Sequence, residues 1–339
     1  MTVLEPGRLT SFQDGGREGH AHLGVPRAGA ADNLSLRQAN LLVGNPEYTA
    51  ALEMTLSGPA LRFEVNAAIA FAGGCVEAHL DDSPIPMYQS VPVRAGQVLT
   101  CGAVQTGLRC YLAVAGGFSI PPVLASASTD TFAGLGPLVL RAGDMFAIQS
   151  HSLYAGWYLR APPEFFDEAT LHVIPGPHAE WFSAGALADF LRTSYQVRAD
   201  SDRTGLRLAG GRVARNNQNE LRSQGMVSGA VQVPGDGHPI VLLPNHGTTG
   251  GYPVIAVVIR ADLPRLGQLR PGATLRFEAV SREQALAALQ AAEAELRHAI
   301  VSADSGLLAA RDLMVLAKSH PALREASLRL GQRRVRLRR

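Results

Sequence analysis

Short apolar runs that end in glycine or proline are the feature that most limits what this chain can fold into. Between Ala67 and Gly117 they read AAIAFAGG, CVEAHLDDSPI, VRAGQVLTCG and GLRCYLAVAGGF, with Asp81 and Asp82 expected at a hairpin tip and a sharp turn expected at each Gly-Gly. The 35 glycines and 21 prolines of the 339 residues recur at the ends of such runs. This punctuation favours a mainly β fold with barrels or sandwiches, plus short helices.

The stretch from Gln13 to Gly44 combines a glycine-rich loop with a helix expected over residues 33–43. Asp32 stands at the N-cap position, and Gly44 supplies the left-handed stop. Polar groups gather near the helix N-terminus, where free N–H groups favour an anion. They are Asp14, Arg17, His20, His22, Arg27 and Asp32. From the residues alone, an anion site and a structural Ω-loop remain equally open.

A strand is expected at residues 52–56, because Leu52, Met54 and Leu56 alternate with polar residues. Glu53 would then lie on the face opposite the leucines. Two interpretations stay open for it. Either it is a solvated strand residue, the commoner case, or its carboxylate faces the pocket of the opening loop.

The second half of the sequence carries a glycine-rich loop between two strongly apolar strands, HPIVLLPNHGTTGGYPVIAVVI. Hydroxyls and backbone N–H groups there could cradle a carboxylate or phosphate, although the lysine of a Walker loop is missing. A hairpin capped by threonines is the alternative, and His246 beside it fits a surface histidine better than a catalytic one. The polar candidates from this half are Asp202, Arg203, Gln232, Thr248, Thr249, Gly250, Gly251 and Tyr252.

Three regions are expected along the chain: a first β domain at 1–160 with the loop and helix, a second at 161–282, and a helical extension at 283–339. Helices are expected at residues 178–193, from a capping box of Ser281 and Gln284 to about residue 300, and at 306–318. The arginine-rich end is read as a solvated or partner-facing terminus.

Composition excludes several classes of function. The formal net charge is only +2, which argues against nucleic acid or an anionic membrane as the partner. No apolar run approaches the roughly 18 residues of a spanning helix, and no secretory signal precedes the first strand, so a cytoplasmic protein is expected. The three cysteines are too few and irregular for a disulfide framework or a zinc site, and no metal site is predicted.

Several motifs in order resemble one known family. They are GRLTSFQDGGREGHAHLGVPRAGAADNLSLRQANLLVGN, ALEMTLSGPALRF, DRTGLRL, GAVQVPGDGHPIVLLP and TTGGYPVIAVVIRADLPRLGQLRPG. Together they span about residues 5–285 and resemble the biotin-dependent carboxyltransferase family, also called allophanate hydrolase subunit 2. Relatives carry an acidic-basic pair before TTGGYP, where this chain has Asn245 and His246.

The resemblance implies tandem cyclophilin-like β-barrel units and a place in a heteromeric enzyme. The family includes the C subunit of bacterial 5-oxoprolinase, which implies ATP as co-substrate, accompanied by Mg²⁺, in opening 5-oxo-L-proline to L-glutamate. Implied partners are an allophanate hydrolase subunit 1 homologue, which is the B subunit of 5-oxoprolinase, and the A subunit of the same enzyme. Asp14, Arg17, Glu53, Asp202 and Arg203 are then the catalytic candidates. The other polar candidates would bind substrate or nucleotide.

The sequence also leaves two other functions open. One is the carboxyltransferase part of a biotin-dependent urea carboxylase; no Met-Lys-Met attachment motif occurs in the chain, so biotin would arrive on another protein. The other is a non-enzymatic regulator that binds a subunit 1 homologue, as the antagonist of the sporulation kinase inhibitor in this family does.

Overall fold

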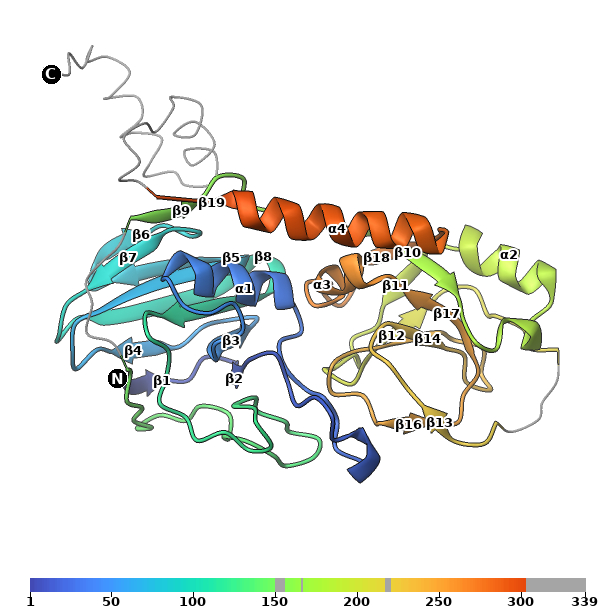
Figure 1. Cartoon of the computed structure of the whole chain (residues 1–339), viewed down its shortest axis with the longest axis horizontal. Coiled ribbons are helices and arrows are strands. Elements are labelled where there is room, and N and C mark those ends of the chain that lie inside the picture. Colours follow the sequence, from blue (N-terminus) through green and yellow to red (C-terminus); the bar gives the residue numbers. More distant parts are fainter. Residues whose placement is uncertain (150–155, 166, 217–220, 303–339) are drawn as a thin grey trace, which may run out of the picture.

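The computed structural model describes residues 1–149, 156–165, 167–216 and 221–302, which form two β units side by side (Figure 1). Most of the regular structure is strand, as the punctuated apolar runs predicted. One hydrophobic core lies within residues 1–159 and a second within residues 171–277.

The first unit is built on an eight-stranded antiparallel sheet with the order β1-β4-β8-β3-β2, from which β5 branches to pair with β6, β7 and β8. Its helix α1, Asn33–Leu42, packs on β5 and β8. The strands are β1 Thr2–Glu5, β2 Leu9–Gln13, β3 Ala51–Thr55, β4 Ala60–Arg62, β5 Ala67–Leu80, β6 Ser83–Ile85, β7 Ser90–Val93 and β8 Val98–Val114.

The expected turn at the first Gly-Gly pair is wrong. Gly73 and Gly74 lie inside β5, where the register to β8 shifts between Gly73 and Cys75. Gly73 has φ +98°, and an added Cβ would lie 2.7 Å from the carbonyl oxygen of Arg109. The glycines therefore form a bulge that lets one long strand continue. The second pair, Gly116–Gly117, does end a strand.

The second unit is a closed barrel with the strand order β10-β17-β14-β15-β12-β11-β18. It closes where β10 and β18 pair in parallel, from Glu168 opposite Thr274 to Val173 opposite Ala279. A small ladder, β13 with β16, lies beside it. The strands are β10 Glu168–Pro175, β11 Tyr195–Val197, β12 Gly205–Ala209, β13 Gln224–Gly225, β14 Ala230–Gln232, β15 Ile240–Leu242, β16 Thr249–Gly250, β17 Val254–Val258 and β18 Thr274–Ala279.

The helix expected over residues 178–193 is two elements, the 3₁₀ turn η2 Ala179–Trp181 and the helix α2 Ala184–Arg192. Ser183 separates them because its extended backbone caps α2, with its side chain accepting a hydrogen bond from the Ala186 N–H. Three further short elements are η1 Ala21–Leu23, η3 Arg260–Asp262 and α3 Leu263–Leu266.

Helix α4, Arg282–Ala299, leaves the barrel and runs along both units (Figure 1). Its predicted capping box of Ser281 and Gln284 is present. Strand β19, Ile300–Ser302, then pairs with β9, Trp157–Leu159, beside the first sheet. The helix predicted at 306–318 and the arginine-rich end lie outside the described residues.

No helix within the described ranges is long and apolar enough to cross a membrane. The three cysteines are free thiols, with Cys101 and Cys110 buried and Cys75 partly exposed.

Candidate functional site

The opening loop is a fixed structure that touches both units. The Arg17 N–H donates to the Arg27 carbonyl at 2.6 Å, and the Ala30 N–H donates to the Asp14 carbonyl at 3.0 Å, so the loop folds back on itself. Gly16 and Gly29 have φ +88° and +90°, and a Cβ on Gly29 would lie 2.9 Å from the Gly16 nitrogen. The Ala28 N–H reaches the carbonyl of Pro244 in the second unit.

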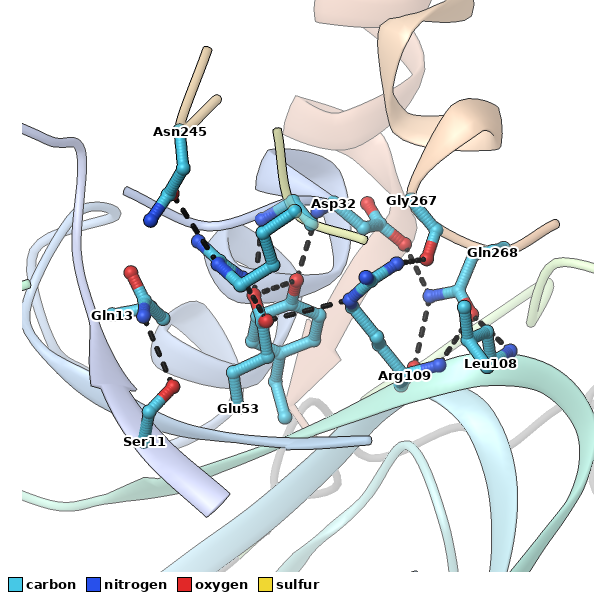
Figure 2. Close-up of polar contacts among 12 residues, drawn as sticks. Ser11, Gln13, Asp32, Glu53, Leu108, Arg109, Asn245, Gly267 and Gln268 are labelled. Carbon is cyan, nitrogen blue, oxygen red and sulfur yellow. Dashed lines mark hydrogen bonds and ion pairs between the residues drawn. The ribbon is translucent and has the colours of Figure 1, made fainter. Parts of the chain in front are cut away.

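Glu53 lies at the centre of a buried polar cluster between the two units (Figure 2). Its carboxylate pairs with Arg203 from the β11–β12 turn and with Arg109 from β8, whose Nε is 3.4 Å away. It also accepts hydrogen bonds from the Ala31 N–H at 3.0 Å and the Tyr111 hydroxyl at 2.7 Å. Of the two interpretations of Glu53, the structure supports the carboxylate that faces the opening loop.

Glu53 does lie on the face opposite Leu52 and Met54, but the expectation that β3 is only half-buried is wrong. Residues Ala51 to Met54 are all buried, because the core covers one face and the opening loop with Arg203 covers the other. Leu56, expected inside, lies beyond the strand with φ +67° and is 41% exposed.

Gln268 extends this cluster toward the start of α1 (Figure 2). Its side-chain oxygen accepts from the Leu108 and Arg109 N–H groups at 2.9 and 3.0 Å. Its nitrogen donates to the Asp32 carboxylate at 2.7 Å and the Arg109 carbonyl at 2.9 Å. Asp32 in turn caps α1 through the Ser35 N–H, as the sequence predicted. We call Glu53, Arg203, Arg109, Asp32 and Gln268 the junction cluster.

The two acids of the junction cluster are shifted in opposite directions. Burial would raise the pKa of Glu53, but the charges of Arg203 and Arg109, with the Ala31 and Tyr111 hydrogen bonds, leave it below its ordinary value. Burial raises the pKa of Asp32, and its hydrogen bonds offset this only in part. Glu53 is thus a paired, ionised group whose oxygens are already occupied, which suits holding the units together better than chemistry.

Asp14 and Arg17 belong to a second cluster that fixes the loop of residues 123–130. Asp14 accepts hydrogen bonds from the Gly16 N–H at 2.8 Å, from the hydroxyls of Ser126 and Ser128, and from the Ala127 N–H at 2.7 Å. Arg17 is 2% exposed and donates to the carbonyls of Val123 and Ser128. Among the described residues, its Nη1 has no hydrogen-bond partner. Burial lowers the pKa of its guanidinium.

A groove of about 820 Å³ lies between the opening loop, one end of the barrel and α4; we call it the loop–barrel groove. Its polar wall includes Arg17, His246 and Thr248. Its apolar wall includes Met226 and Leu286, the second from α4. Concave sites with an apolar wall and few polar groups are typical of small-molecule binding, so this groove is the candidate active site.

The remaining predicted residues lie apart from the junction cluster. Gln232 is buried near the groove, 3.4 Å from the sulfur of Met226, which lines it. Thr249 and Tyr252 are exposed, and Gly250 pairs with Gln224 in the small ladder that also includes Thr249. Gly251 is partly exposed.

Asp202 is exposed and accepts from the Thr204 N–H at 2.7 Å, which makes it a turn-forming residue. The structure thus divides part of the predicted set among the junction, the Asp14 cluster and the groove, and it leaves Asp202, Thr249 and Tyr252 exposed outside all three.

Sequence reasoning missed Arg109, Gln268 and Tyr111, and it took His246 for a surface histidine, whereas this residue is 8% exposed and lines the groove. The signal for Arg109 was a charged residue inside the apolar run GLRCYLAV, which burial makes costly without a partner. Gln268 carried no comparable signal, because its partners come from residues more than 150 positions away. Across the described residues, no group of three His, Cys, Asp or Glu side chains is arranged to hold a metal ion.

Comparison with known proteins places the chain in a family. Residues 23–279 match the family described as carboxyltransferase domain, subdomain A and B. The C subunit of 5-oxoprolinase from Escherichia coli (strain K12) is 39% identical over 293 residues, covering 86% of this chain and 94% of that protein. The corresponding 5-oxoprolinase protein of Haemophilus influenzae, also named as the C subunit, is 36% identical over 288 residues, covering 84% and 93%.

Longer proteins match over the same part of this chain. Urea amidolyase of Saccharomyces cerevisiae is 32% identical over 307 residues, covering 84% of this chain and 17% of that protein. The crystal structure of Kluyveromyces lactis urea amidolyase superimposes with a TM-score of 0.81 at 30% identity, covering 87% of this chain and 19% of the other. This chain therefore corresponds to about a fifth of those proteins, whereas it spans nearly all of the bacterial relatives. It belongs to the carboxyltransferase domain family.

Proposed function

We propose that this protein is a subunit of an ATP-dependent 5-oxoprolinase, which opens 5-oxo-L-proline to L-glutamate with hydrolysis of ATP. One observation carries the proposal: a protein named as the C subunit of 5-oxoprolinase is 39% identical and aligns over 94% of its length. The urea amidolyase match is weaker at 32% and concerns 17% of a much longer protein.

The chemistry explains why ATP is needed. A lactam resists water because opening it sacrifices amide resonance, and transfer of a phosphoryl group to the carbonyl oxygen makes the carbon a better electrophile. The substrate also carries a carboxylate, which calls for a cation or hydrogen-bond donors. In the loop–barrel groove, the exposed Arg260 and the Thr248 hydroxyl are groups of this kind, whereas the guanidinium of Arg17 is buried against the carbonyls of Val123 and Ser128. Mg²⁺ enters the proposal as the companion of ATP.

Arg203 takes a structural role in this proposal. Its three nitrogens contact Glu53, the Gly29 carbonyl and the Asn245 side chain, so its donors serve the junction. Glu53 and Asp32 act with it. Their contribution to turnover is to hold the opening loop and the barrel loop at a fixed separation across the groove.

Two relatives are named as the C subunit of 5-oxoprolinase, and this name supports partners for the present protein as well. We propose that the A and B subunits of 5-oxoprolinase are both required, and that the groove is completed in their complex. The B subunit here is the allophanate hydrolase subunit 1 homologue. A shared site would account for the modest number of reactive groups that this chain places in the groove.

The test is to measure ADP and glutamate release from 5-oxoproline by the purified chain mixed with the A and B subunits, omitting one component at a time. The proposal expects both products only in the complete mixture. If a complex forms but releases neither product, 5-oxoprolinase activity is excluded. Carboxylation of urea with a biotinylated carrier protein is then assayed, and a regulatory role follows if that also fails.

A further inference from the structure

His246 occupies a defined place in the wall of the loop–barrel groove. It lies between β15 and β16 and is 8% exposed, and its backbone N–H donates to the Leu243 carbonyl at 2.9 Å. The residue before it, Asn245, is tied on both sides, by Arg203 and by the carboxylate of Asp130 at 3.1 Å. The backbone that carries the imidazole is therefore held in place through Asn245 by Arg203 of the junction cluster and by Asp130.

One ring nitrogen of His246 is committed to the backbone. Nδ1 lies 2.7 Å from the carbonyl oxygen of Gly247, and because a carbonyl can only accept, Nδ1 carries the proton. The neutral ring then has its lone pair on Nε2. Within the part of the chain that the structure describes, Nε2 forms no hydrogen bond. A lone pair is thus available in a ring that lines the groove.

The charges around the groove favour the neutral ring. The charged groups that line it are Arg17, Arg27, Arg260 and Glu18, and Glu18 is paired with Arg27 at 2.9 Å. Burial lowers the pKa of His246, and only the hydrogen bond to Gly247 opposes the shift. The imidazole is accordingly unprotonated near neutral pH and able to accept a proton.

We propose that His246 Nε2 is the proton acceptor that activates water in the loop–barrel groove, an inference that rests on the proposed function. Nε2 takes a proton as the water oxygen bonds to the carbonyl carbon, whose oxygen carries the phosphoryl group from ATP. When the C–N bond breaks, the imidazolium returns its proton to the departing nitrogen and ends neutral, and the proton of the new hydroxyl group also passes to that nitrogen as the C=O bond of the acyl phosphate forms. The acyl phosphate that remains takes a second water and gives carboxylate and phosphate.

His246→Asn is the decisive variant. The Asn amide nitrogen can replace Nδ1 in the hydrogen bond to Gly247, so the loop keeps its anchor while the base is lost. In the complete three-subunit mixture, kcat is expected to fall by about 100- to 1,000-fold with KM nearly unchanged. The rise of wild-type kcat/KM with pH, through a pKa below the ordinary histidine value of 6.5, should disappear. His298→Asn, on the exposed face of α4, is the control and should behave as wild type.

Retention of wild-type kcat and of the acidic limb by His246→Asn would overturn the assignment. Nitrogen NMR of the histidine rings in the purified chain provides a second measurement that does not need turnover. It should show His246 neutral at pH 7 with the proton on Nδ1. A proton on Nε2, or a pKa at or above 6.5, would refute the inference. An inactive wild-type mixture would instead refute the proposed function, and the NMR result alone would then decide about His246.

Discussion

The junction cluster and the loop–barrel groove both lie where the opening loop meets the barrel, but their polar groups differ in whether they already have partners. At the junction, Glu53 and Arg109 are buried, Arg203 is partly buried, and the three side chains are paired. In the wall of the groove, as far as the described residues extend, His246 keeps a free lone pair on Nε2. Satisfied polar groups hold a structure, whereas groups with unused capacity can act on a ligand. A buried acid beside two arginines resembles a catalytic group, but the oxygens of Glu53 already have hydrogen-bond and ion-pair partners, which indicates a structural role.

The strongest way to break this contrast is to remove the carboxylate charge at the junction. Glu53→Gln leaves the buried Arg109 and the partly buried Arg203 without their anion, and such a loss destabilises by about 3 to 5 kcal/mol. Urea unfolding followed by circular dichroism measures it. Glu77→Gln on the exposed side of β5 is the control, with an expected change under about 0.5 kcal/mol.

The pH dependence of unfolding of wild type and Glu53→Gln tests whether Glu53 is ionised in the folded state. The pKa of Glu53 in the folded state is below its ordinary value of 4.5, so its stabilisation is fully present above that value. The stabilisation is lost as the pH falls through the folded-state pKa, where wild type and Glu53→Gln should converge. A constant difference between them down to pH 2 would contradict the ionised, paired state.

Gly136→Ala tests whether the Asp14 cluster positions Arg17 for the groove. Gly136 has φ +78°, and an added Cβ would overlap the Ser128 carbonyl oxygen and lie 2.6 Å from Arg17 Nη2. Strain and overlap together should cost about 2 to 3 kcal/mol in urea unfolding and reduce turnover. Gly134→Ala is the matched control: φ is +67° but the space is open, so only the backbone strain of about 1 kcal/mol should appear. Equal effects of the two substitutions would show that the contact with Arg17 contributes neither to stability nor to turnover.

Two neighbouring threonines test which side of their loop faces the substrate. Thr248 lines it, whereas Thr249 is exposed and lies outside its wall. Thr248→Val should raise KM for 5-oxoproline about 10-fold, or about 1.4 kcal/mol, through loss of one hydrogen bond. Thr249→Val should change KM less than about twofold. The reverse order would move the substrate site to the outer side of the loop.

The smallest effect concerns the attachment of α4 to the first unit. Arg37 on α1 forms hydrogen bonds to Glu293 at 2.7 and 2.6 Å and to Glu47 at 2.6 Å. The hydrogen bond from Arg37 lowers the pKa of Glu293. Because Glu293 is partly exposed, Arg37→Ala should cost only about 1 kcal/mol and should speed amide exchange in α4. Arg192→Ala, from an exposed pair with Asp189, is the control and should have no measurable effect.

Local patterns predicted much of the fold correctly. The cap at Asp32, the stop at Gly44 and the capping box of Ser281 all involve groups within four residues of one another, so sequence spacing suffices to find them. The broken helix at Ser183 and the bulge at Gly73 show the limit. Serine and glycine each permit several local structures, and the packing around them selects one.

The site was harder to predict because its contacts are long-range. Asp14, Arg17, Glu53 and Arg203 were all singled out, but the sequence did not separate those that pair with each other from those that face the groove. Glu53 and Arg203 are 150 residues apart, and only the folded chain shows that they neutralise each other. His246 was given little weight because a histidine in a polar loop is usually solvated.

The pairing of β19 with β9 has a consequence for how the two units stay together. The polypeptide passes from the first unit into the barrel after β9 and returns through α4 to a strand beside β9. Two covalent connections thus keep the barrel at a high effective concentration relative to the first unit, so little free energy is needed to bring them into contact. The ion pairs between the units can then serve to fix the angle between the first unit and the barrel. A partner protein would therefore meet a surface in which the parts from the two units are already aligned.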